Sequence, residues 1–165
     1  MAALYTNHIK FCCSQLLHDR KVRWLGTYVR DQITLFKNEK RLFALVINTY
    51  VAAKPGQHWL AFYAPRDSFK IEMFDYFGLL PNVLSFDPSL IHFSSRSIQS
   101  FGSKFYGHYA LLFIYFRSRN YSFNNTINNL NKNFTDASAA RKIYDLSRSK
   151  LSKIHCTGQC CKNKS

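Results

Sequence analysis

Hydrophobic positions along the chain switch between a helical period and short continuous runs. Residues 8–18 place their apolar side chains roughly on one face of a helix, which predicts an amphipathic helix. Residues 42–50 form a nearly continuous apolar and β-branched run, as is typical of a strand covered on both faces. Shorter extended segments are predicted at 24–29, 58–64, 69–75 and 91–98.

The longest apolar run, Phe105–Phe116, is hydrophobic nearly all round, which predicts a helix in the middle of the fold. Helical spacing recurs over 123–134, and a basic helix is predicted over 137–151. Residues 1–151 are therefore interpreted as a single domain of strands and helices around a central buried helix. Residues 152–165 lack periodicity, and we expect a disordered basic tail that contains cysteines.

The chain is strongly basic. It carries 23 Lys and Arg against 9 Asp and Glu, a formal net charge of +14. A domain with this excess associates with polyanions such as nucleic acid or anionic membrane surfaces. The size of the excess favours non-specific, electrostatic nucleic-acid binding over a role in solubility alone.

Neither a secretory signal nor a membrane span is predicted. The segment from Met1 to Leu17 is interrupted by polar residues and lacks a small-residue cleavage site. The longest apolar run has about twelve residues, whereas a membrane-spanning helix needs roughly twenty. We therefore expect an intracellular protein that is not secreted and has no membrane partner.

The cysteines do not predict a disulfide framework, because their number is odd and they cluster near the two ends: Cys12, Cys13, Cys156, Cys160 and Cys161. His155 and the last three cysteines could ligate a metal through imidazole and thiolate groups. The tail lacks a second ligand pair at a familiar zinc spacing, so no metal site is predicted.

The two strands 58–64 and 69–75 are joined by Pro65-Arg-Asp-Ser68, which has good hairpin chemistry. If the loop is centred between Arg66 and Asp67, His58 falls directly opposite Asp75. Directly opposed residues are close enough for a carboxylate to fix the tautomer of an imidazole. The pair predicts the base and orienting acid of a catalytic triad; the alternative interpretation is a surface His–Asp pair.

A third catalytic group is expected from the first turn of the buried helix, where free amides and the helix dipole stabilise anions. That turn contains Tyr106, Gly107 and His108. Seven residues before Tyr106 stands Gln99, whose side-chain amide could donate to an oxyanion at the same place.

These segments together resemble a known family. Gly56-Gln-His58-Trp59, Phe74-Asp75-Tyr-Phe-Gly78, Ile98-Gln99 and Tyr106-Gly107-His-Tyr are similar to motifs of the adenovirus-type cysteine endopeptidases (adenain). The segment from Trp24 to Tyr28 also resembles the N-terminal motif of that family. The likeness spans roughly residues 15–125 and is greatest to members carried by Maverick/Polinton transposons and related viruses.

The resemblance implies an α+β, papain-like fold of the adenain type, in which a central buried helix packs against a mixed β-sheet. It also implies specific roles for residues. His58 would be the general base, Asp75 its orienting acid, and Gln99 part of the oxyanion hole, while Trp59 and Gly107 would shape the substrate groove. The chain departs from the family at Tyr106, where the family has its nucleophilic cysteine. A phenol is a weaker acid than a thiol and a poorer acyl carrier.

The resemblance and the departure together predict an inactive cysteine protease-like protein that retains binding to DNA or to a polypeptide such as a capsid-type precursor. No bound cofactor is predicted, although active members of the family are stimulated by DNA and a viral peptide. The nucleus and the virion are the compartments that this resemblance suggests. Two alternatives stay open: a relative of the SUMO-type deconjugating cysteine proteases, and a DNA-binding protein that uses Tyr106 in phosphoryl transfer.

Overall fold

The computed structural model describes residues 4–18, 20–30, 42–49, 58–84, 86–98 and 104–159, with the side chains of the last helix described up to Arg148. Helices, strands and 3-10 turns follow one another in this order: α1 (Thr6–Leu17), β1 (Arg23–Val29), β2 (Phe43–Asn48), β3 (Trp59–Ala64), β4 (Ile71–Asp75), η3 (Pro81–Leu84), η4 (Pro88–Leu90), β5 (Ile91–Phe93), α2 (Tyr106–Arg117), α3 (Phe123–Asn133) and α4 (Asp136–Gln159). The α+β class predicted from the sequence is confirmed.

The strands form one mixed sheet of five strands in the order β1-β2-β3-β4-β5. The outer pairs, β1 with β2 and β4 with β5, are parallel, whereas β2–β3 and β3–β4 are antiparallel. Every residue of β2 and β3 is buried. The prediction that residues 42–50 contain a strand covered on both faces is therefore confirmed.

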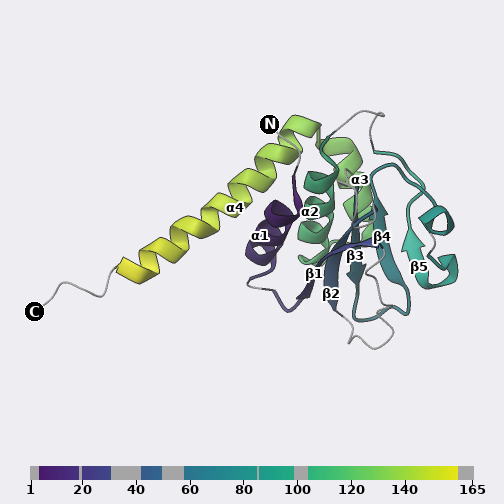
Figure 1. Cartoon of the computed structure of the whole chain (residues 1–165), viewed down its shortest axis with the longest axis horizontal. Helices are drawn as coiled ribbons and strands as arrows, with labels where there is room; N and C mark the ends of the chain where they lie inside the picture. The colour runs from purple at the N-terminus through teal and green to yellow at the C-terminus, as the bar shows by residue number, and fades with distance from the viewer. Residues whose placement is uncertain are drawn as a thin grey trace, which may run out of the picture.

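Helix α2 is the centre of the larger hydrophobic core. It packs against β3 and also contacts α1, α3 and α4, and its residues from Gly107 to Ile114 are all buried. The rings of Phe113 and Phe74 stack with their centroids 5.2 Å apart, which joins α2 to β4. Figure 1 shows α1, α2 and α3 gathered on one face of the sheet. The buried central helix predicted from the apolar run is thus present.

The largest differences in length from the predictions are in the last helix and the last strand. The last helix continues to Gln159, beyond the end predicted near Leu151, and in Figure 1 its C-terminal half extends past the rest of the chain. The strand predicted over 91–98 is short, because β5 covers only Ile91–Phe93. Among the residues described, no helix combines the length and apolar character needed to cross a membrane.

The predicted register of the β3–β4 hairpin is wrong by two residues. Leu60, not His58, is paired with Asp75. The cause is the loop, which runs from Pro65 to Lys70 because the Ser68 hydroxyl bonds with both the amide and the carbonyl of Lys70. A shift of two leaves each side chain on its predicted face, because side chains alternate with a period of two.

At the C-terminal end of α2 a buried ion pair joins this helix to the sheet. Arg117 donates to both carboxylate oxygens of Glu72 in β4, at 2.5 and 2.7 Å, and to the Tyr121 carbonyl. Its guanidinium also lies 4.9 Å from the ring centroid of Tyr63 in β3. The two-pronged geometry offsets part of the desolvation cost of burying both charges.

We expect Glu72→Ala to lower the free energy of unfolding by about 3–5 kcal/mol, because it leaves the Arg117 charge buried without its partner. The double change Glu72→Met with Arg117→Met removes both charges and should cost clearly less. Urea unfolding of the two variants and the wild type tests this order. Equal losses in the two variants would contradict a role for the unpaired charge.

Candidate functional site

The carboxylate of Asp75, at the end of β4, organises the turn that follows it. Oδ1 accepts from the Phe77 amide at 3.0 Å and Oδ2 from the Leu79 amide at 2.9 Å, while the Asp75 carbonyl accepts from Gly78 at 3.1 Å. The side chain is fully buried. Asp75 therefore has a structural role in the turn besides any role toward His58.

The same turn needs a glycine at position 78. Its φ of +69° is left-handed, and a Cβ there would lie 2.5 Å from the Ser95 carbonyl oxygen. The Ile98 amide donates to the Tyr76 carbonyl at 3.1 Å, so the segment before Ile98 runs beside the turn. Only glycine combines this backbone conformation with so close an approach.

His58 lies directly before β3 and meets Asp75 diagonally across the hairpin. Its Nε2 is 2.7 Å from Asp75 Oδ1. Within the described residues, however, neither ring nitrogen meets a partner with hydrogen-bond geometry. The two side chains are therefore in close contact without a well-aligned hydrogen bond. The predicted proximity of His58 and Asp75 is present, although the register that led to it is wrong.

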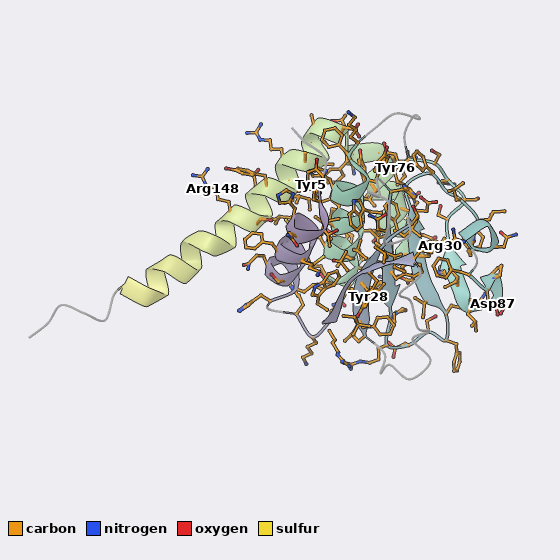
Figure 2. The ribbon with its side chains drawn as sticks, viewed as in Figure 1. Tyr5, Tyr28, Arg30, Tyr76, Asp87 and Arg148 are labelled. Carbon is orange, nitrogen blue, oxygen red and sulfur yellow. The ribbon has the colours of Figure 1, made fainter. Side chains whose placement is uncertain are left out.

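Aromatic rings enclose His58. Phe77 stacks on the imidazole with centroids 4.7 Å apart, and Tyr106 meets it edge-on at 5.4 Å. Tyr106 also contacts Tyr76 at 5.6 Å and Phe77 at 5.5 Å. Tyr76, which is labelled in Figure 2, is fully buried. The phenol ring thus belongs to a packed aromatic group beside the histidine.

Tyr106, at the predicted nucleophile position, is the first residue of α2. The first amides of a helix have no intrahelical acceptor and favour negative charge. The helix ladder begins with the His108 and Tyr109 amides, which both bond to the Phe105 carbonyl. These two amides are therefore engaged within the helix. Gln99, the other predicted donor, lies outside the described residues.

Trp59 and Gly107, both predicted to shape a substrate groove, are packing positions here. Trp59 is buried, and its indole Nε1 donates to the Leu4 carbonyl at 3.2 Å. A Cβ at Gly107 would lie 3.1 Å from Leu4 and 3.3 Å from Trp59. Gly107 therefore permits the N-terminal segment to pass close over α2. Contact of either residue with a substrate stays a prediction.

A second buried histidine follows in α2. His108 is buried, and burial lowers its pKa to about 4. The imidazole is therefore neutral near pH 7 and adds no positive charge to the first turn of the helix. His58 is the histidine that contacts a carboxylate in this part of the structure.

Two cysteines have described side chains, and neither is a nucleophile candidate. Burial raises the pKa of the Cys12 and Cys13 thiols, and Cys12 also accepts a hydrogen bond from Ser147 at 3.3 Å. Both lie in α1. In the portion of the chain described, no three His, Cys, Asp or Glu side chains gather as metal ligands.

Comparison with known proteins adds no relative: no protein-family model matches the chain, and no curated protein matches it. The site must therefore be interpreted from its own geometry. That geometry brings together a buried carboxylate, an imidazole and the N-terminus of a buried helix.

The spacing of residues in the sequence did not predict that aromatic rings enclose His58. Phe77 directly follows the turn residue Tyr76 and reads as an ordinary loop aromatic. Its stacking on His58 depends on the turn that the Asp75 carboxylate holds. The contact can therefore be recognised in the structure but not in the residue pattern.

We expect Asp75→Asn to lower the free energy of unfolding by about 1–3 kcal/mol, because an amide keeps at most one of the two backbone hydrogen bonds in a buried place. Asp87→Asn is the matched control: Asp87 bonds the Ser89 amide at 2.9 Å in the same manner but is exposed. The control should lose distinctly less stability in thermal or urea unfolding. A loss as large at Asp87 would contradict the special importance of the turn after β4.

Proposed function

We propose that the chain is an adenain-type, papain-like cysteine protease scaffold whose nucleophile has been replaced by Tyr106, and that it is inactive as a peptidase. The observation that carries this proposal is the position of the Tyr106 ring, edge-on to His58 while His58 contacts Asp75. A cysteine at the first residue of α2 would face the imidazole from the end of the helix that stabilises a thiolate. The order of these three groups along the chain is also that of the family the sequence resembles.

A tyrosine in place of the nucleophilic cysteine prevents peptide hydrolysis in two ways. A phenol is a poorer nucleophile near neutral pH than a thiolate, and it makes a poor acyl carrier. Its ring also fills the space beside His58, against Tyr76 and Phe77, where an acyl group would have to lie. Neither described thiol can substitute, because Cys12 and Cys13 are buried in α1.

The function we propose is therefore binding rather than hydrolysis. Candidate partners are a polypeptide such as a capsid-type precursor and nucleic acid, in the nucleus or the virion. The net charge of +14 supports the second partner, because Lys and Arg contact phosphates without regard to sequence.

The two alternatives gain less support from the geometry. The SUMO-type deconjugating proteases share the same order of groups but need the same cysteine. Phosphoryl transfer by Tyr106 would need cations around the phenol, whereas the ring contacts of Tyr106 are with His58, Tyr76 and Phe77.

Restoring the thiol tests the proposal. We expect the wild type to cleave no peptide, and Tyr106→Cys to gain a thiol that alkylates at pH 7 more than about tenfold faster than Cys12, because His58 and the helix N-terminus lower its pKa. Alkylation followed by mass mapping of the modified residue measures both rates. Some stability should be lost, since the smaller side chain leaves a cavity.

The control is Tyr106→Cys combined with His58→Ala, which should lose the enhanced reactivity while keeping the thiol. Peptide cleavage by the wild type that Tyr106→Phe abolishes would overturn the claim of inactivity. If the thiol introduced by Tyr106→Cys reacts no faster than Cys12, the assignment of the nucleophile position is wrong.

Nucleic-acid binding is tested separately. We expect the full chain to bind a fluorescent DNA duplex without sequence preference and to lose affinity steeply between about 50 and 200 mM salt, because binding releases counterions from phosphates. Fluorescence anisotropy on two unrelated duplexes measures both properties. Binding that ignores salt, or no binding at low salt, would contradict this part of the proposal.

A further inference from the structure

A cleft of about 600 Å³ opens at the other end of α2, away from His58. It lies between the segment before β1, the start of β2, the β3–β4 loop and the turn after α2. Its lining residues are Arg20, Lys21, Val22, Leu42, Tyr63, Pro65, Arg66, Asp67, Arg117, Ser118 and Asn120. At a rise of 1.5 Å per residue, its helical wall at Arg117 is about 16 Å along α2 from Tyr106.

The inner wall of the cleft is held rigidly. Tyr63, Arg117 and Ser118 are all buried, and Arg117 is fixed by its bidentate pair with Glu72 and by its contact with the Tyr63 ring. The Ser118 hydroxyl is likewise engaged, since it donates to the Tyr115 carbonyl at 2.8 Å. This wall therefore does not need a ligand to keep its shape.

The rim has unpaired positive charge. Arg20, Lys21 and Arg66 are exposed, and in the described part of the chain no carboxylate lies within ion-pair distance of any of the three. The lining includes one exposed carboxylate, that of Asp67. Arg117 and Glu72 form a pair of their own, so among the described lining residues three exposed cations stand against one exposed anion.

From this arrangement we infer that the cleft binds a phosphate group with two or more negative charges. Guanidinium groups match phosphate oxygens in pairs, and an ammonium adds a point charge, so two arginines and a lysine suit this anion better than a monocarboxylate. The volume lies within the range of small-molecule sites and exceeds that of a single phosphate. The ligand is therefore a polyphosphate chain or a phosphate that ends a larger molecule.

This inference goes beyond the proposed function and does not rest on it. The cleft shares no residue with the group formed by His58, Asp75 and Tyr106. The chain could bind phosphate here whether or not a nucleophile was ever present at the other end of α2. The thiol experiment and the phosphate experiment can therefore fail separately.

The test is calorimetric titration of the full chain with tripolyphosphate at moderate salt. We expect saturable binding in the wild type, and a loss of affinity of more than about tenfold in the variant Arg20→Gln, Lys21→Gln, Arg66→Gln. All three positions are exposed, so the melting temperature should change little. Absence of saturable binding in the wild type would overturn the inference.

A matched control removes the same charge elsewhere. Lys10→Gln, Lys132→Gln, Arg148→Gln takes three exposed cations from α1, α3 and α4, and none of them lines the cleft. Arg148 projects from α4 in Figure 2. This variant should bind tripolyphosphate within about threefold of the wild type. An equal loss in both triple variants would show that affinity follows total charge and would overturn the cleft as the site.

We expect Asp67→Asn to change the affinity for tripolyphosphate in the opposite direction to the loss of the three cations. Removing the one exposed carboxylate of the described lining should raise the affinity for tripolyphosphate by about threefold, whereas a decrease would contradict a direct approach of the anion to this rim.

Oligonucleotides with and without a 5′-phosphate distinguish the source of the phosphate group. A preference for the phosphorylated oligonucleotide that the cleft variant abolishes identifies a nucleic-acid end, and no such preference identifies a free phosphoanion.

Discussion

Burial of α2 against β3 and β4 is the constraint on which the rest of the structure depends. The helix is apolar on almost every side, so it is stable only where the sheet, α1, α3 and α4 cover it together. Its two ends are then fixed in space. One end brings Tyr106 to His58, and the other brings Arg117 to Glu72. The candidate site and the basic cleft are consequences of this single packing arrangement.

The sequence predicted the faces of the hairpin better than its register. His58 and Asp75 meet because side-chain alternation survives a shift of two residues, even though the bonds of Ser68 to Lys70 lengthen the loop. The number of residues that a turn takes depends on such local hydrogen bonds, which composition alone does not reveal. The buried helix and the central strands were predictable because long apolar runs leave few alternatives to burial.

Contacts between distant residues were not predictable in the same way. Glu72 reads as the polar position of an alternating strand, and Arg117 reads as the charged end of an apolar run. Their pairing across 45 positions exists only because α2 packs on the sheet, mainly on β3, with its C-terminal end beside β4. The stacking of Phe77 on His58 similarly follows from the turn that Asp75 holds. In both places a polar or aromatic residue gains its role from the packing of its neighbours.

The role of Asp75 in the turn also bears on how the arrangement of His58 and Asp75 is maintained. Its carboxylate accepts two backbone amides, and Gly78 fits against Ser95, whatever residue begins α2. Replacing a small nucleophile by tyrosine adds ring contacts with Tyr76 and Phe77 and breaks none of these bonds. The arrangement of His58 and Asp75 is therefore maintained by stability as well as by any catalytic use. The turn bonds thus place Asp75, and the ring contacts place Tyr106 beside His58, independently of any chemistry at the site.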